Sequence, residues 1–389
     1  MEFRFGEQEE RLRQEVRAFL QEHLRPTDEI RWLGYSPEVF EAARAFHKKL
    51  AARGWLAPAW PKEYGGLGAS IYEQMVFNEE LGYANAPDTG IRTFSVGMLG
   101  PTLILHGSDE QKRAHLPPIT AGDVIWCQGY SEPGAGSDLA ALQTRAVRDG
   151  DDYVITGHKI WISNAHRADW MFLLARTDPQ APKHQGISFF LLDLRHSPGV
   201  TIRPIYNLAG GHYFNEVFFE DVRVPRKNLV GEENRGWYVA MTLLDFERSN
   251  IGATAAQRRT LEELAAYLRA ARPAVRARHR LGLAELVIAN TVARHLGYRI
   301  GYLQASGGHP NYEASVVKVF GTELDQRVYQ FALGVLGLGG QLLPGDPRAP
   351  IRGKMPVGHL AAVAPPIYGG TNEIQRNIIA TRGLGLPRE

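Results

Sequence analysis

Hydrophobic positions in the first third of the 389-residue chain recur with a helical spacing. Four apolar residues fall at i, i+4, i+7 and i+8, the pattern of an amphipathic helix: Leu12, Val16, Phe19 and Leu20. A second helix is predicted from Ser36 to about residue 53, because a capping residue followed by a proline favours a helix start. A short helix is predicted to begin at the capping box of residues 108–111 and to end near Pro117 and Pro118.

The middle of the chain has the pattern of strands. Turn residues separate five short β-prone runs: residues 153–155, 170–175, 187–192, 200–202 and 217–219. Strands at this spacing, with no helix between them, predict an antiparallel sandwich or barrel rather than a parallel dinucleotide-binding sheet.

Helical spacing returns towards the C-terminus. Three segments are long enough for a helical bundle: residues 237–268, 274–306 and 313–338. Residues 369–382 are predicted as a loop leading into a helix. The order α, β, α predicts an α+β multidomain protein with a helical N-terminal domain (1–122), a β middle domain (123–231) and a C-terminal helical bundle (232–389).

Composition removes several classes of function. The net charge of +2 argues against a dedicated nucleic-acid binder. One cysteine, Cys127, excludes an internal disulfide framework and any cysteine-cluster metal site, and the 13 histidines show no metal-binding spacing. The first residues are charged and no apolar run approaches the ~20 residues of a membrane span. We therefore expect a cytoplasmic protein with no bound metal and no membrane span.

A glycine-rich segment lies where the pattern changes from helices to strands, at residues 126–138. Its Gly-Ala-Gly-Ser stretch exposes backbone N–H groups and a hydroxyl, which suit a phosphate or the polar edge of a ring. The alternative is a tight turn that merely needs glycines. A second segment, residues 159–164, carries Trp161 and Ser163 two positions apart, so both are predicted on one face of a strand. They could cover and bond a flat heterocycle; the alternative is a core tryptophan beside a turn serine.

A carboxylate interrupts the apolar stripe of the predicted helix 237–268. The stripe consists of Trp237, Ala240, Leu244, Glu247 and Ile251, and Glu247 is its only ionisable member. Burial would raise the pKa of such a carboxyl, as a general base near neutral pH requires. The alternative is a structural ion pair with Arg248 or with another cation.

Residues 364–376 contain two glycines followed by Thr-Asn-Glu, with Thr371 as a candidate N-cap. A helix N-terminus presented by glycines suits an anion, and the alternative is an ordinary cap.

Together these segments and their order resemble the acyl-CoA dehydrogenase family. The resemblance covers essentially the whole chain, and its most specific parts are residues 130–138, 159–164, 219–225 and 367–376. It implies a helical N-terminal domain, a β-barrel middle domain and a C-terminal bundle, with FAD between barrel and bundle and partly bound by a neighbouring subunit. The implied reaction is α,β-desaturation of an acyl-CoA in fatty acid or lipid metabolism such as β-oxidation. The product is a trans-2-enoyl-CoA, and electrons pass to an electron-transferring flavoprotein.

The resemblance also implies a set of site residues. The FAD contacts would come from Gln128, Tyr130, Ser131, Ser137, Trp161, Ser163, Gly340, Thr371 and Glu373. The acyl-CoA contacts would come from Ser137, Asp245, Arg248, Gly369 and Gly370, with the backbone N–H of Gly369 on the thioester carbonyl.

The resemblance also selects the catalytic base. Many family members carry a glutamate where this chain has Gly369. A second branch, with isovaleryl- and long-chain-type enzymes, carries its glutamate on the bundle helix before an arginine, as Glu247 and Arg248 stand here. Glu247 is therefore the predicted catalytic base. The room left at Gly369 predicts a branched, long or ring-bearing acyl group.

Two departures concern the neighbouring subunit. The Arg-x-x-Phe-Gly segment that grips a neighbour's FAD in many members is represented here only by residues 272–276, without the Phe-Gly. Family members frequently carry a glutamine before a Gly-Gly pair in the bundle, and this chain has Leu336 ahead of Gly339 and Gly340. The chain is therefore predicted to form a homo-oligomer, a tetramer or dimer, or a heteromer with a related subunit. Two alternative functions stay open: an FAD- and CoA-binding subunit active only in a heteromer, and a flavin-dependent oxidase or monooxygenase on the same fold.

Overall fold

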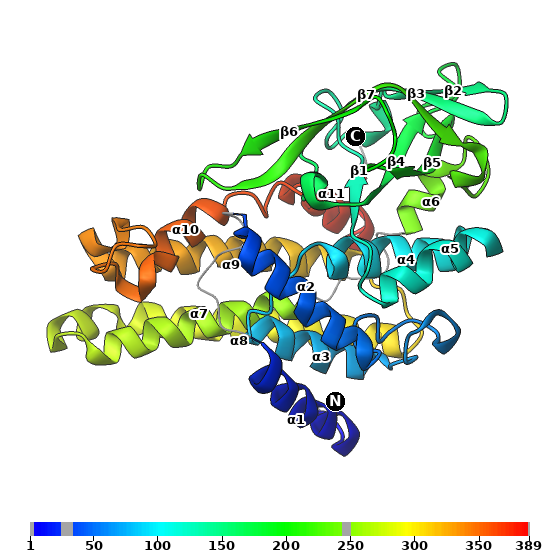
Figure 1. Ribbon diagram of the computed structural model, residues 1–389. Coiled ribbons are helices and arrows are strands. Elements are labelled where there is room, and N and C mark those ends of the chain that lie inside the picture. The colour runs from blue at the N-terminus through cyan, green and yellow to red at the C-terminus, as the bar shows by residue number, and fades with distance from the viewer. Residues whose placement is uncertain (1–3, 25–33, 243–249, 388–389) are drawn as a thin grey trace. The chain divides into compact units, whose positions relative to one another are not determined.

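The computed structural model describes residues 4–24, 34–242 and 250–387 (Figure 1). The chain divides into two units. The bundle unit combines Met1–Ile30, Ser70–Ala86 and Arg248–Glu389. The sheet unit combines Arg31–Ala69 and Pro87–Glu247. Two stretches from the first third of the chain therefore belong with the C-terminal helices.

The bundle unit is helical throughout its regular structure. Its helices are α1 (Glu7–His23), α3 (Ile71–Tyr83), α7 (Ile251–Ala270), α8 (Pro273–Ala305), α9 (Tyr312–Leu336), α10 (Lys354–Ala361) and α11 (Asn372–Ile378), with short turns η8 (Gly337–Gln341), η9 (Pro350–Gly353) and η10 (Ile379–Gly383). The amphipathic helix predicted at the N-terminus is confirmed by α1, which buries Val16, Phe19 and Leu20. α3 approaches α7 so closely that a Cβ on Gly82 would lie 2.1 Å from the carbonyl oxygen of Gly252, which leaves room only for glycine there.

Buried charges join three of these helices. Arg13 on α1 contacts Glu79 and Glu80 of α3 at 3.0 and 2.5 Å. Arg294 on α8 contacts Glu79 at 2.6 Å. Burial alone would raise the pKa of Glu79, but the two guanidinium groups outweigh it and lower that pKa below its usual range. The segment containing α3 is thus joined to α8 by an ion pair whose carboxylate is buried and whose guanidinium is partly exposed.

The single helix predicted over residues 237–268 is wrong. α6 spans Gly236–Thr242 and α7 begins at Ile251, after Asn250 with a φ of 51°. This left-handed conformation is one that asparagine adopts more readily than most residues. The spacing of apolar residues is not changed by one left-handed residue, so the helical pattern continued through the position where the helix is interrupted.

The sheet unit carries the strands and the remaining helices. Its helices are α2 (Pro37–Ala52), α4 (Gly100–His106), α5 (Asp109–Thr120) and α6, with a π-helix η3 (Ile91–Leu99) and 3₁₀ turns η2 (Lys62–Tyr64), η4 (Leu139–Ala141), η5 (Ala165–Arg167) and η6 (Arg226–Asn228). The two predicted caps are confirmed: Ser36 accepts a hydrogen bond from Val39 N, and Ser108 and Gln111 form a capping box. α5 continues past its two prolines to Thr120, because both proline carbonyls still accept bonds from residues further along.

The sheet has eight strands: β1 (Trp126–Gly129), β2 (Arg145–Asp149), β3 (Asp152–Lys159), β4 (Trp170–Arg176), β5 (Ile187–Asp193), β6 (Val200–Tyr206), β7 (His212–Pro225) and β8 (Leu229–Val230). The five predicted β runs lie in β3 to β7 (Figure 1). β1, β2 and β8 were not predicted. The strand order is β6-β7-β3-β2-β4-β5-β8, with β1 beside β4.

The antiparallel barrel predicted for this region does not close, and its sheet is not purely antiparallel. Among the described residues no pairing joins β6 to β8, so the sheet stays open. β1 and β2 both pair parallel with β4. These parallel pairs arise between segments far apart along the chain, which strand spacing alone does not reveal. The broader fold class, helical terminal regions around a β middle, is confirmed.

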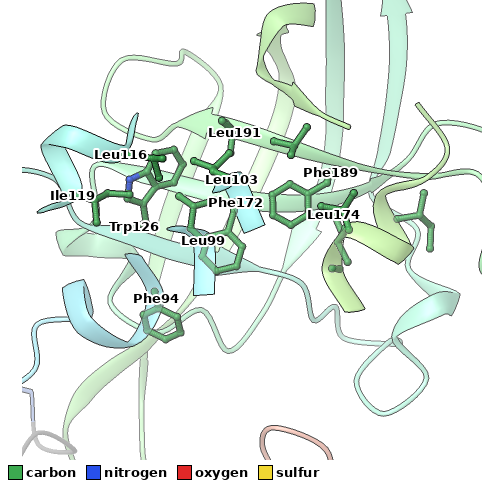
Figure 2. Packing of buried hydrophobic residues seen from close by; sticks show 14 of the residues in the cluster. Phe94, Leu99, Leu103, Leu116, Ile119, Trp126, Phe172, Leu174, Phe189 and Leu191 are labelled. Atoms are coloured by element: carbon green, nitrogen blue, oxygen red, sulfur yellow. The ribbon is translucent and has the colours of Figure 1, made fainter. Parts of the chain in front are cut away.

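The core of the sheet unit lies between the sheet and α4, α5 and η3. Figure 2 shows Phe172 of β4 and Phe189 of β5 with Leu99 and Leu103 of the helical side. The rings of Phe172 and Phe189 stack with centroids 6.0 Å apart. Burying large apolar side chains of this kind stabilises the fold by about 1.5–3 kcal/mol each. Within the described ranges, no helix combines the length and apolar character needed to span a bilayer.

The stability of the sheet unit is expected to fall in mild acid because of His47. This residue of α2 is fully buried; its Nε2 faces the Pro87 carbonyl at 3.2 Å and Thr89 Oγ1 faces its Nδ1 at 3.3 Å. Burial lowers the pKa of His47 to about 4, below its unfolded value, so stability is complete above pH 6.5 and is lost as the pH falls towards 4. At pH 5 the loss through this residue is about 2 kcal/mol relative to pH 8.

Denaturant unfolding at pH 8 and pH 5 measures this. His47→Gln should reduce the difference between the two pH values, whereas His196→Gln, at an exposed histidine, should not. An equal pH dependence in wild type and His47→Gln would contradict the prediction.

Candidate functional site

β1 forms the first four residues of the glycine-rich segment and pairs with β4. Gly129 pairs with Leu173, and a Cβ on Gly129 would lie 2.3 Å from the sulfur of Met171, so a larger residue would displace the Met171 side chain. Gln128, one residue earlier, is half-buried with its amide nitrogen 3.9 Å from the sulfur of Met98. The start of the segment is therefore fixed on the sheet.

The hydroxyl group of Tyr130 has no hydrogen-bond partner among the described residues. Its ring packs edge-on against Phe172 and Phe189, with centroids 5.8 and 6.4 Å away. Burial raises the pKa of Tyr130 well above its usual range, opposed by the Gln128 side chain. Among the described residues, Oη makes no hydrogen bond of ordinary geometry. A buried hydroxyl usually has a partner, and a bound ligand would supply the one that this hydroxyl lacks among the described residues.

A buried ion pair holds the rest of the segment in place. Lys159, at the end of β3, donates from Nζ to Glu132 Oε1 at 2.8 Å and to the Tyr130 carbonyl at 2.9 Å. Glu132 also accepts from the backbone N–H groups of Gln143 and Thr144, at 2.6 and 2.9 Å. Burial alone would raise the pKa of Glu132, but the ammonium and the N–H groups lower it below its usual range. Burial lowers the pKa of Lys159 to about 8 despite the carboxylate.

Two of the three glycines of the segment, Gly134 and Gly136, face open space. Glu132 and Ala135 close a turn with backbone hydrogen bonds of 3.1 and 3.0 Å. Neither Gly134 nor Gly136 has a positive φ, and no described atom lies within 4 Å of a Cβ built on either. The turn itself therefore does not need glycine at these positions, which disfavours the alternative of a merely structural turn. Small residues leave this surface, including the exposed Ser137, open to a ligand.

The structure contradicts the prediction that Trp161 and Ser163 share a face of a strand. β3 ends at Lys159, and Trp161 has a φ of 63°. The chain leaves the strand because Ile162 N bonds the carbonyl of Asn215 on β7, at 2.9 Å. Trp161 is 57% exposed, so the alternative of a core tryptophan is also wrong. Its ring meets the edge of Phe214 at 6.2 Å.

The second cluster of predicted site residues lies in the bundle unit, before α11. Gly369 and Gly370 have φ values of 64° and 80°, left-handed conformations that favour glycine. Thr371 is confirmed as the N-cap: its Oγ1 accepts from Ile374 N at 3.2 Å. The neighbouring Glu373 is exposed, and its own backbone N–H and then the Thr371 hydroxyl lower its pKa. The two glycines are exposed, so their backbone groups are accessible.

A lysine on α9 anchors this loop. Lys318 Nζ donates to the carbonyls of Pro366 and Gly370, at 3.2 and 2.9 Å, and to Asn372 Oδ1 at 2.8 Å. Asn372 in turn donates to Thr322 Oγ1 at 3.1 Å. Burial lowers the pKa of Lys318 to about 8, although the Glu373 carboxylate raises it. The loop conformation is thus set by contacts with a helix about 50 residues earlier.

The remaining predicted residues divide into two groups. Gly340 is buried in η8, where a Cβ would lie 3.1 and 3.3 Å from side-chain atoms of Leu336 and Leu333, a tight fit. Asp245, Glu247 and Arg248 lie outside the described residues.

No role was assigned from the sequence to three residues that support the site: Lys159, Glu132 and Lys318. For Lys159 a signal existed. It continues the inward-facing positions of Tyr153 and Ile155 along β3, and a lysine at an inward position requires a buried partner. Lys318 had no such signal, because its partners are mostly backbone carbonyls.

Family models match nearly the entire chain. The acyl-CoA dehydrogenase N-terminal domain matches residues 6–123, the middle domain residues 127–222 and the C-terminal domain residues 234–384. The chain belongs to the acyl-CoA dehydrogenase family. It is accordingly an oxidoreductase of a flavoprotein family.

This dehydrogenase has several similar relatives. Acyl-CoA dehydrogenase IpdE1 of Mycobacterium tuberculosis is 41% identical over 363 residues, 92% of this chain and 91% of the relative. The solved Tcur3481-Tcur3483 steroid ACAD is 37% identical over the full length of both chains, with a TM-score of 0.90. The ChsE4-ChsE5 complex from Mycobacterium tuberculosis contains a chain that is 36% identical over the full length of both, with a TM-score of 0.86.

The residues present in this dehydrogenase fit a flavin. The unsatisfied hydroxyl of Tyr130 offers a donor, and the open surface at Gly134 and Gly136 leaves space. The exposed ring of Trp161 offers a flat apolar cover in the same unit. A planar heterocycle with polar edges and a diphosphate needs these three kinds of group.

Proposed function

We propose that this dehydrogenase uses FAD to desaturate an acyl-CoA thioester to a trans-2-enoyl-CoA. The observation that carries the proposal is that hydrogen bonds join two segments of the sheet unit, the glycine-rich segment and the turn that contains Trp161. Ile160 N, next to Trp161, bonds the Ser131 carbonyl at 3.0 Å, and Lys159 bonds the Tyr130 carbonyl at 2.9 Å. The hydroxyl-bearing segment and the tryptophan turn are therefore one assembly.

FAD, when bound, would supply the acceptor for the hydride that leaves the β-carbon with the two electrons of its C–H bond. The chain's own residues bind, orient and exclude water. Gln128, Tyr130 and Ser131 would contact the flavin ring, Trp161 would cover it, and Ser163 would hydrogen-bond it. Ser137 would contact the diphosphate or the CoA. In the bundle unit, Gly340, Thr371 and Glu373 would complete the FAD contacts.

The acyl-CoA side of the reaction needs a base and a donor. The α-proton of a thioester is weakly acidic, so its removal requires a positioned base and stabilisation of the developing enolate oxygen. We assign the proton transfer to Glu247 and the hydrogen bond on the thioester carbonyl to the backbone N–H of Gly369. Gly370, Asp245 and Arg248 would contact the acyl-CoA. The exposed, left-handed backbone of Gly369 supports this role, since its N–H lies in an accessible loop.

The acyl group that we propose bears rings. No described atom lies within 4 Å of a Cβ built on Gly369, so the position where many relatives carry glutamate is open. Of the predicted branched, long and ring-bearing groups, the relatives favour the last, since one solved structure of 37% identity is named a steroid ACAD.

We also propose that a related subunit completes the enzyme. The segment at residues 272–276 lacks the Phe-Gly of the family pattern. On α8, which begins within that segment, Leu281 and Ile288 expose 68% and 64% of their surface and Val292 is also exposed, an apolar stripe that suits a partner. A relative of 36% identity was solved as the ChsE4-ChsE5 complex. Electrons would pass from the enzyme to an electron-transferring flavoprotein.

The test is an absorbance spectrum of the purified chain followed by anaerobic titration with acyl-CoAs. Ring-bearing, branched, long straight and short straight acyl groups form the panel. We expect a flavin spectrum that bleaches most completely with the ring-bearing thioester. A clear preference for short straight chains would contradict the proposed substrate class.

The same experiment separates the alternatives. A colourless, inactive chain that takes up FAD when a related subunit is added would show that the heteromer is required. Release of hydrogen peroxide, or a hydroxylated product in the presence of a reductant, would indicate an oxidase or monooxygenase instead.

A further inference from the structure

We propose that Asn215 is a positioning residue for the flavin: its amide fixes the left-handed turn that presents Trp161. The inference rests on the proposed function, since it assumes that Trp161 covers the flavin. Asn215 lies on β7, about 50 residues after the turn, and is fully buried.

The turn is strained and needs an external constraint. Trp161 has a φ of 63°, which for a residue with a Cβ costs roughly 1–2 kcal/mol. A large side chain persists in this region only where surrounding contacts determine the backbone. Trp161 is also more than half exposed, so packing of its own ring cannot supply that constraint.

Asn215 supplies the constraint by hydrogen-bonding both backbone groups of Ile162. Ile162 N donates to the Asn215 carbonyl at 2.9 Å, and Asn215 Nδ2 donates to the Ile162 carbonyl at 2.9 Å. The N–H and the C=O of Ile162, which directly follows Trp161, are thus both held by Asn215. On the other side of Trp161, Ile160 N is bonded to the Ser131 carbonyl at 3.0 Å. Trp161 is therefore held between two tethers.

The orientation of the Asn215 amide is determined by two histidines. His212 Nε2 lies 2.8 Å from Oδ1, and His166 Nδ1 lies 3.2 Å from Nδ2. The two imidazole rings stack with centroids 4.0 Å apart. Burial, and then the charges of His212 and Arg167, lower the pKa of His166 to about 4, so at neutral pH its Nδ1 is able to accept from the amide. Oδ1 then faces His212, and Nδ2 faces Ile162 and His166.

An isosteric carboxylate cannot reproduce this arrangement. Asn215→Asp keeps the shape but replaces the donor Nδ2 with an acceptor that would face the Ile162 carbonyl and the His166 lone pair. Asn215→Ser is a milder change that removes both polar atoms of the amide without adding a charge. Preorganisation of the tryptophan would be lost in both variants, and FAD binding would weaken because ordering the turn would then occur on binding.

Two measurements test the inference on the full-length chain, in the assembly in which it holds FAD. The first is ¹⁹F NMR of protein labelled with fluorotryptophan, with Trp161→Phe to assign the resonance. The second is the FAD dissociation constant of the apoprotein. We expect both Asn215 variants to shift or broaden the Trp161 resonance and to raise the FAD dissociation constant about 10-fold. Asn290→Asp is the matched control: Asn290 is buried on α8 and donates to the Thr254 carbonyl at 3.0 Å.

The outcomes separate this inference from the function on which it rests. If Trp161→Phe weakens FAD binding but neither Asn215 variant does, the positioning role is overturned alone. If Trp161→Phe leaves FAD binding unchanged, the flavin role of Trp161 and the inference both fail. An unshifted Trp161 resonance in both Asn215 variants, or equal changes in Asn290→Asp, also overturns the inference.

Discussion

Replacing Glu247 with glutamine is expected to slow the bleaching of the flavin by acyl-CoA about 10²- to 10⁴-fold, the usual contribution of a positioned general base. The amide keeps the size of the side chain but cannot accept the α-proton. FAD content and acyl-CoA binding should stay close to wild type, since the substitution removes no charge that the proposed FAD contacts need. Anaerobic stopped-flow absorbance measures the rate, and the spectral shift on mixing measures binding.

Glu262→Gln is the control for this change. Glu262 is an exposed glutamate on α7 that accepts a hydrogen bond from Tyr83 at 2.6 Å, so its loss should leave the bleaching rate unchanged. A rate within tenfold of wild type in Glu247→Gln would remove Glu247 from the role of base. The structural ion pair with Arg248 would then be the better interpretation of that carboxylate.

Replacing Lys159 with methionine is expected to lower the free energy of unfolding by about 3–5 kcal/mol, because it leaves the buried Glu132 carboxylate without its cation. The two side chains are 0% and 6% exposed, so water does not screen the loss. The variant should also bind FAD more weakly, since Lys159 holds the Tyr130 carbonyl and Glu132 holds the backbone of residues 143–144. Denaturant unfolding and FAD titration measure the two effects.

Two further variants give this prediction its controls. Glu132→Gln added to Lys159→Met removes the unpaired charge and should restore part of the lost stability. Lys183→Met breaks the exposed pair with Asp138 in the same segment and should cost no more than about 1 kcal/mol. A loss in Lys159→Met as small as that in Lys183→Met would show that the buried pair does not stabilise the segment.

The sequence pattern identified elements whose signals are local. The apolar face of α1 and the caps at Ser36, Ser108 and Thr371 could be predicted because each depends on residues within two turns of a helix. The strands from β3 to β7 were predicted for the same reason, since β-prone residues lie within each strand and turn residues lie at its ends. β1 and β8, of four and two residues, are too short to show a period.

The site was predicted less completely than the fold. Its segments were recognised together, but the strand predicted through Trp161 failed because a hydrogen bond to Asn215, more than 50 residues away, turns the chain. Lys318 and Asn215 gave no sequence signal, because each bonds to backbone groups of distant segments. Backbone groups are the same in every residue, so these bonds do not mark the positions in the sequence.

The amino-acid sequence by itself determined the order of helices and strands, the family and the candidate chemistry, because periodicity, caps and motif residues are properties of neighbouring positions. The tertiary structure decided that the sheet stays open with parallel pairs at β4, that Trp161 is exposed on a strained turn, and that a buried lysine and carboxylate support the glycine segment. The physical reason is that burial and hydrogen-bond partners depend on segments distant along the chain, whose meeting no local pattern specifies.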